Sequence, residues 1–167
     1  VFNLALNPAE EADTLAGLLE VRNQAPAPIN GNGIPVAGIN GKLKVDTSGK
    51  LHLDNVDTEL AAGGRITFNG NIDSANQNMA VDAAVQQFKL QDILKQKLDL
   101  SLDGDIKLSG SLGSPQADWQ LKAGQTATSG TFQLLTDKTN RQRSISLQQV
   151  KITPANGGEM QGEALLE

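Results

Sequence analysis

The feature that most constrains this chain is a long alternation of apolar and polar residues between positions 98 and 112, LDLSLDGDIKLSGSL. A two-residue period is typical of a β-strand that has one apolar and one polar face. The apolar positions share one parity: Leu98, Leu100, Leu102, Ile106, Leu108 and Leu112. The central question for the fold is therefore what covers the apolar face.

The pair Asp103-Gly104 resembles a two-residue hairpin turn. A hairpin at that point would set Leu102 opposite Asp105, although cross-strand neighbours share a face. The alternation survives if the strand continues through Gly104, or if a three-residue loop over 103–105 reverses the chain. We favour the straight strand, because a glycine in the middle of such a loop is not where the left-handed conformation is needed. Its roughly 50 Å length, at ~3.3 Å per residue, predicts an elongated sheet rather than a small barrel.

The same period recurs from Ile39 to the C-terminus, in segments separated by Gly, Asn, Asp or Ser. It predicts about eight or nine strands. One segment, FKLQDILKQKL at 88–98, keeps helical spacing instead and predicts a short helix or helical turn. Gly70, Gly104 and Gly110 lie on the apolar parity of their segments, where glycine indicates either bending with close backbone approach or an ordinary turn.

The N-terminal region has the signals of a helix. Asn7 can cap it, Pro8 suits its first position and Glu10 completes a capping box. One helical face is then apolar: Ala12, Leu15, Leu18 and Leu19. We therefore predict a helix over 8–21, followed by a loop over the Pro-, Gly- and Asn-rich stretch 23–41.

Two short helices cannot cover a sheet of this size, so the sheet must fold over itself. One alternative is a narrow sandwich filled by Leu, Ile and Val, although sandwich cores usually carry more aromatic residues than the 3% of this chain. The other is a folded sheet left partly open, with something else filling its trough. The residues alone leave both alternatives open.

Composition excludes several functions. The 19 acidic against 14 basic residues give a net charge of −5 without any Lys/Arg cluster, which argues against nucleic-acid binding and against electrostatic docking to anionic membranes. Cysteine is absent, so there is neither a disulfide framework nor a thiolate metal site. No apolar run is long enough to span a membrane.

Catalytic and metal-binding motifs are also missing. His52, the only histidine, lies between Leu51 and Leu53 and is expected to point to water. No serine occupies a Gly-x-Ser-x-Gly elbow. Asp99, Asp103 and Asp105 lack the spacing of an EF-hand loop. We therefore expect a protein that is not an enzyme and has no catalytic residues, metal or cofactor.

The stretch from 88 to 123 resembles the repeats of the AsmA-like envelope proteins, particularly the C-terminal region of the TamB-like members. In that family an L-x-x-L segment leads into G-x-I-x-L-x-G strands, a Gly-x-Pro turn and another amphipathic strand. The matching positions here are Leu90, Ile93, Leu94, Gly104, Ile106, Leu108, Gly110, Gly113 and Pro115. The segment 38–72 has the same alternating pattern with interspersed glycines, whereas the Pro-, Gly- and Asn-rich stretch 23–41 matches no repeat.

The resemblance implies a mainly β fold, an elongated curved antiparallel or mixed sheet folded lengthwise into a β-taco with an open apolar trough and one or two short helices. It implies a single module over 1–167, excised from a longer protein that is anchored in the inner membrane of a diderm bacterium and crosses the periplasm. The implied partner of the whole protein is the outer-membrane barrel protein TamA. The implied roles are outer-membrane protein (autotransporter) assembly and phospholipid transport.

Three hypotheses follow: a conduit for phospholipid acyl chains, a module that binds nascent outer-membrane β-strands by strand addition, and a filled spacer. In the first two, the apolar residues of one parity line a groove. The predicted groove residues are Leu43, Val45, Leu51, Leu53, Ile66, Phe68, Ile72, Val81, Val85, Leu98, Leu100, Leu102, Ile106, Leu108, Leu112, Trp119, Leu121, Phe132, Leu134, Ile145, Leu147 and Ile152.

Overall fold

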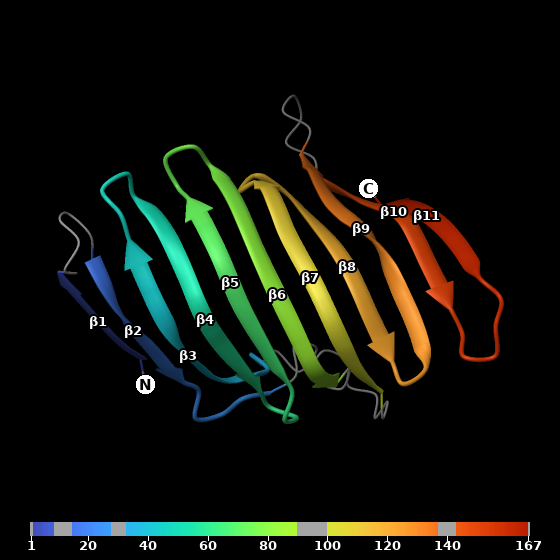
Figure 1. Cartoon of the computed structure of the whole chain (residues 1–167), viewed down its shortest axis with the longest axis horizontal. Helices are drawn as coiled ribbons and strands as arrows, with labels where there is room; N and C mark the ends of the chain where they lie inside the picture. The colour runs from blue at the N-terminus through green and yellow to red at the C-terminus, as the bar shows by residue number, and fades with distance from the viewer. Residues whose placement is uncertain (1, 9–14, 28–32, 90–99, 137–142, 167) are drawn as a thin grey trace.

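The computed structural model of the chain describes residues 2–8, 15–27, 33–89, 100–136 and 143–166. They form one antiparallel sheet of eleven strands, in which each strand pairs with the next along the chain (Figure 1). The strands are β1 (Phe2–Pro8), β2 (Leu15–Arg22), β3 (Val36–Val45), β4 (Lys50–Leu60), β5 (Arg65–Asp73), β6 (Asn78–Lys89), β7 (Ser101–Ser111), β8 (Ser114–Ala123), β9 (Thr126–Thr136), β10 (Arg143–Thr153) and β11 (Met160–Leu166).

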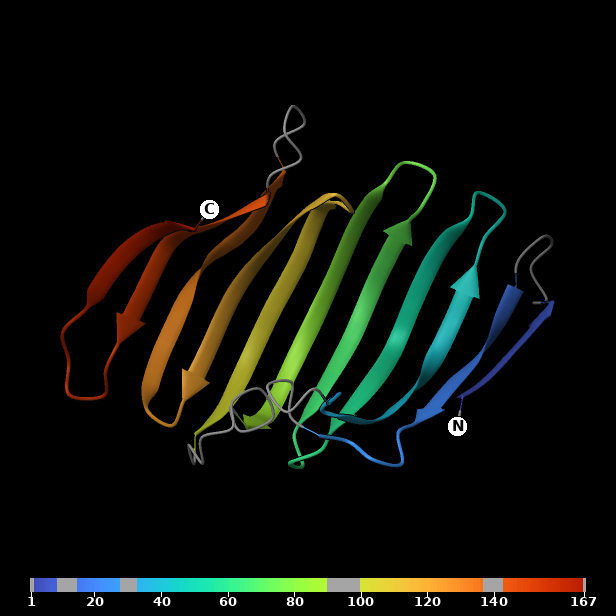
Figure 2. The ribbon, with the colours of Figure 1, turned by 180° about the vertical axis from the view of Figure 1, so that it is seen from behind.

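The sheet is curved and open. Its first and last strands lie at opposite edges, so it does not close into a barrel (Figure 1). Seen from either side, the strands of the described residues form a single layer (Figures 1 and 2). The predicted mainly β, elongated, curved class is confirmed. Of the two arrangements that the sequence left open, the narrow sandwich of two packed layers does not form within the described residues.

The predicted helix over 8–21 is wrong. Pro8 ends β1, and 15–21 belongs to β2, which pairs with both β1 and β3; residues 9–14 lie outside the described part. Leu15 and Leu19 share a face in a strand as well as in a helix. Sheet pairing on both sides favours the strand, because tertiary context overrides local propensity. Every strand pairing among the described residues is antiparallel, so of the antiparallel and mixed alternatives the antiparallel sheet forms. The ranges that the structure describes contain no helix.

Two other boundaries differ from those predicted. The loop predicted over 23–41 ends sooner, because β3 already begins at Val36 and pairs with β2 from Gly38 onward. Phe88 and Lys89 complete β6 rather than opening a helical turn. The remainder of that predicted turn, 90–98, falls outside the described residues.

The straight strand through Gly104 is confirmed. β7 runs from Ser101 to Ser111 without a turn at 103–104, and Gly104 pairs with Leu121 of β8. Positions 98 and 99 of the predicted strand are not described. Because the chain does not reverse at Asp103, every leucine and isoleucine of β7 keeps its parity, as the alternation requires.

A bulge with a side-chain cap occurs twice in this sheet. In β4, Asn55 has a positive φ of 50°, and its N–H donates to the side-chain oxygen of Asn69 in β5 at 2.8 Å. In β6, Gln87 has the same φ of 50°, and its N–H donates to Asp103 in β7 at 2.8 Å. The extra residue increases local twist and bend.

A glycine follows each capping residue directly. Gly70 comes after Asn69 and has a φ of 144°; Gly104 comes after Asp103 and has a φ of 141°. A Cβ at Gly70 would lie 2.2 Å from the backbone oxygen of Ala80, and one at Gly104 would lie 2.1 Å from that of Gln120. The close backbone approach expected at these two glycines is therefore present.

Candidate hydrophobic binding face

We define the apolar face as the side of the sheet that carries Leu53, Val81 and Leu108, and the polar face as its opposite side. Directly paired residues of neighbouring strands lie on the same face. One unbroken row therefore crosses the sheet from β3 to β10, each member paired with the next: Leu43, Leu53, Gly70, Val81, Leu108, Ala117, Phe132 and Leu147.

The structure brings the predicted groove residues together on this face. Pairings connect those that lie in strands, for example Ile66 with Val85 and Ile106 with Trp119. Leu100 and Leu112 are described but lie just outside the strands, Leu100 with 39% of its surface exposed. Leu98 lies outside the described residues.

Bulges explain the apolar residues that sequence reasoning missed. The bulge at Asn55 switches the parity of β4, so Val56 and Leu60 join the same face as Leu53. Both are only 6% exposed. The sequence does contain the signal, because the apolar positions change parity between Leu53 and Val56; Phe88 joins the face in the same way after Gln87.

The central side chains of the apolar face are shielded from solvent, although the described residues contain no second layer of strands. Val81, Ala83 and Val85 of β6 are 4–5% exposed, and Ile106 and Leu108 of β7 are half-buried. On the polar face, Asp82 and Lys107 of the same two strands are exposed. Burial therefore follows the apolar face and is deepest over β4 to β6.

Trp119 is the only tryptophan and lies on the apolar face near the centre of the sheet. Its indole occupies the space above Gly130 of β9, where a Cβ would lie 2.5 Å from the ring. Its Nε1–H donates to the hydroxyl of Thr128 at 3.4 Å. The polar end of the indole thus has a partner within the sheet, and the ring adds apolar surface to the face.

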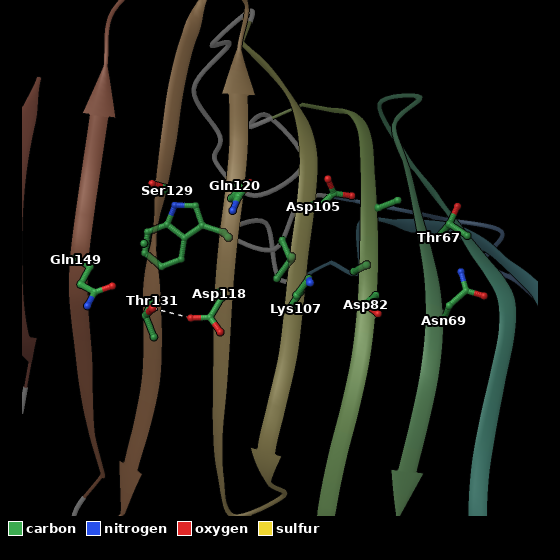
Figure 3. Close-up of a pocket in the computed structure, with 15 residues that line it drawn as sticks. Thr67, Asn69, Asp82, Asp105, Lys107, Asp118, Gln120, Ser129, Thr131 and Gln149 are labelled. Atoms are coloured by element: carbon green, nitrogen blue, oxygen red, sulfur yellow. Dashed lines mark hydrogen bonds between the residues drawn. The ribbon is translucent and has the colours of Figure 1, made fainter. Parts of the chain in front are cut away.

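A hollow of about 680 Å³ lies on the polar face (Figure 3). Two adjacent rows of this face line it: Thr67, Asp105, Gln120 and Ser129, and Asn69, Asp82, Lys107, Asp118 and Thr131. The sequence predicts a trough with apolar walls, whereas the walls of this hollow are mostly polar, with Ala83, Ala84, Ile106 and Trp119 as its apolar members, so it is a different feature.

Some of the polar groups around this hollow form hydrogen bonds within the sheet. Asp118 accepts a hydrogen bond from the Thr131 hydroxyl at 2.6 Å (Figure 3). It accepts another from the Gln116 side-chain amide at 3.2 Å. Nearby, Asp57 accepts one from Thr67 at 2.5 Å. These pairs are typical of a hydrated sheet surface.

His52 pairs with Lys44 and Asn71 on the polar face, as predicted. Its Nε2 lies 3.3 Å from Asp46 Oδ2 in the turn between β3 and β4. The hydrogen bond from the Ser48 hydroxyl, followed by that from the Lys50 N–H, holds the pKa of Asp46 well below its ordinary value. Asp46 thereby stabilises the turn as a hydrogen-bond acceptor.

Asp103 accepts the hydrogen bond from the Gln87 N–H at the β6 bulge, so its carboxylate stabilises the sheet. Within the described ranges, His, Asp and Glu side chains form no cluster of three that could hold a metal ion. Those ranges likewise contain no helix that is both long and apolar enough to cross a membrane.

Comparison with known proteins gave no match to any family model, curated protein or solved structure.

Proposed function

We propose that this chain is a non-catalytic module whose apolar face carries the acyl chains of phospholipids. The observation that supports this proposal is the unbroken apolar row across a single-layer sheet, from Leu43 to Leu147. A sheet that presents such a face gains from contact with hydrocarbon, because burial of apolar surface is favourable and needs no directional chemistry.

The expected affinity comes from methylene burial. Each fully buried CH₂ contributes about 0.8 kcal/mol. An acyl chain with about ten methylenes against the face, each half-covered, would gain roughly 4 kcal/mol before the cost of ordering. Such a gain holds a lipid weakly enough for it to move along the face.

The charge of the chain is consistent with contact through acyl chains rather than through headgroups. With a net charge of −5 it is repelled by anionic headgroups. Headgroups would remain in water beside the face, and hydrocarbon contact would supply the affinity.

The wider setting is part of the same proposal and is supported by the repeat resemblance. We place the module in the periplasm, within an inner-membrane-anchored TamB-like protein that acts with the outer-membrane barrel protein TamA in outer-membrane protein assembly and phospholipid transport. In this setting the sheet would be one segment of a longer apolar path.

The open edges of the sheet support a second candidate function. β1 and β11 each pair with one strand only among the described residues, so a nascent outer-membrane β-strand could add at an edge while the apolar face contacts its alternate side chains. A purely structural spacer is the third candidate, which an experiment must distinguish from lipid carriage and from strand binding.

A charged residue on the apolar face tests the lipid proposal. Ile106→Arg and Leu102→Asp should each abolish lipid co-purification, because the charge must be desolvated when hydrocarbon covers it. Gln120→Arg is the matched control for Ile106→Arg: it adds the same charge at an exposed position of the neighbouring strand, on the polar face. Unchanged lipid in a folded Ile106→Arg variant would reject the proposal.

A photoreactive residue at Leu108, in the central row, separates the cargo classes. Lipid adducts support the conduit and peptide adducts support strand binding. A spacer would give neither adduct, and an apolar dye added to it would show no increase in fluorescence.

A further inference from the structure

A second hollow on the polar face, of about 540 Å³, lies over β2, β3 and β4 near the N-terminal side of the sheet (Figure 1). We call it the β2–β4 hollow. Two rows of directly paired residues line it: Ala16, Lys44 and His52, and Leu18, Lys42 and Asp54. Its volume is within the range of about 300–1,000 Å³ that is typical of small-molecule sites.

The floor of the β2–β4 hollow is apolar, unlike the mostly polar walls of the hollow in Figure 3. Leu18 has 61% of its surface exposed, and Ala16 lies two residues before it on the same side of β2. The alkyl stems of Lys42 and Lys44 add to this surface, because a lysine can place its stem on apolar atoms and keep its ammonium group in water. The hollow can therefore cover a short hydrocarbon chain.

The cations beside this floor outnumber the anions. Lys42 and Lys44 are two residues apart in β3, so their Cα atoms are about 7 Å apart and both side chains lie on the polar face. Asp54 is the single carboxylate that lines the hollow, and it accepts a hydrogen bond from the Asn55 side-chain amide at 2.8 Å. The local charge is thus positive, although the whole chain has a net charge of −5.

Lys42 is available for a ligand. It faces Asp54 across the strand pair, but no hydrogen bond or ion pair connects its ammonium group to another of the described residues. Phosphate and carboxylate oxygens accept charge-assisted hydrogen bonds from ammonium groups. An anionic head held by the lysines would leave an attached alkyl tail next to Leu18 and Ala16.

We propose that the β2–β4 hollow binds a single-chain amphipathic anion, with its phosphate or carboxylate head at Lys42 and Lys44 and its alkyl tail on Ala16 and Leu18. Charge complementarity selects the head, and burial of the exposed leucine favours the tail. This site is on the side of the sheet opposite the apolar face, so it is separate from the proposed acyl-chain path.

Titration with dodecyl phosphate, below its critical micelle concentration, tests the site. The amide NMR signals of Gly17 and Leu43, whose backbone lines the hollow, should shift and saturate. Lys42→Gln should weaken binding about threefold, and Lys42→Gln with Lys44→Gln about tenfold, because each removes one charge at the protein surface. Lys107→Gln, at an exposed position of the polar face in β7, is the matched control and should leave binding unchanged.

Three further probes separate head from tail. Laurate carries a carboxylate on a similar tail, and the tighter of laurate and dodecyl phosphate identifies the preferred head. Inorganic phosphate lacks the tail, and dodecyl maltoside lacks the charge, so both should bind at least about tenfold more weakly. Either of them binding as tightly as dodecyl phosphate contradicts the proposal, as does unchanged binding in a folded double lysine variant or an absence of saturable shifts with both anions.

Ile106→Arg keeps this test apart from the proposed function. That substitution changes the apolar face and should leave the titration of the Gly17 and Leu43 signals unaltered, whatever it does to lipid co-purification. If Ile106→Arg removes the shifts, they report binding to the apolar face and the β2–β4 hollow is not the site.

Discussion

Replacing Gly104 with alanine should destabilise the sheet strongly. The φ of 141° is one that L-amino acids rarely adopt, and this alone costs about 1–3 kcal/mol. The new Cβ would lie 2.1 Å from the backbone oxygen of Gln120 and 3.0 Å from the Cα of Leu121, so β7 and β8 would have to separate. Overpacking of this kind typically costs a further 1–3 kcal/mol.

These two costs overlap, because one backbone shift can relieve both, and alanine regains about 0.5–1 kcal/mol relative to glycine in a strand. We therefore expect Gly104→Ala to lower the free energy of unfolding by about 3 kcal/mol. In a chain of this length the loss corresponds to a fall in Tm of roughly 6–12 °C.

Urea or thermal unfolding followed by circular dichroism measures this difference. Gly113→Ala is the matched control, because a Cβ there has no heavy atom within 4 Å and its φ is not in the left-handed region. It should change stability by no more than about 0.5 kcal/mol. If the two variants unfold at the same temperature, the close approach at Gly104 does not constrain the sheet and the reasoning fails.

Three further predictions concern the bulges, the β3–β4 turn and the tryptophan. Asp103→Ala removes the acceptor of the Gln87 N–H and should cost about 1 kcal/mol, measured by urea unfolding, with faster amide exchange at Gln87; exchange as slow as in wild type would show that the cap is dispensable. Because the pKa of Asp46 is lowered in the folded chain, its stabilising contribution is present above the unfolded pKa of about 3.9 and is lost as the pH falls below it. The urea midpoint of wild type should accordingly fall more steeply below about pH 4 than that of Asp46→Ala, and parallel curves would contradict this. Gly130→Ala should displace the indole of Trp119 and alter its near-ultraviolet circular dichroism while the far-ultraviolet spectrum is retained; an unaltered near-ultraviolet signal would show that the ring does not rest on Gly130.

Side-chain alternation and one turn rule predicted how the centre of the sheet is built. Alternation is incompatible with a two-residue hairpin at Asp103-Gly104, and the position of Gly104 disfavours a three-residue loop over 103–105. The straight β7 predicted from these two arguments is present in the structure. Direct pairing then brings residues as distant in sequence as Leu43 and Leu147 onto one face. The two-residue period is a local signal in the sequence of each strand, so it can be recognised before the fold is known.

The N-terminal region and the parity changes could not be predicted in the same way. Residues 15–21 satisfy helical and strand spacing together, and the choice depends on pairing with β1 and β3, which the sequence does not reveal. The change of parity between Leu53 and Val56 is visible in the sequence, but the bulges at Asn55 and Gln87 depend on acceptors in the following strand. The register is therefore needed to place Val56 and Leu60 on the apolar face.

Contact between acyl chains and the apolar face can be measured through Trp119, the single tryptophan on that face. Phospholipids with brominated acyl chains quench indole fluorescence on contact. The account predicts strong quenching in the wild-type chain, and its loss when Trp119→Phe is combined with Gln120→Trp, which moves the tryptophan to the polar face. Equal quenching of both proteins, or none in the wild-type chain with its fold intact, would contradict the claim that this face holds hydrocarbon.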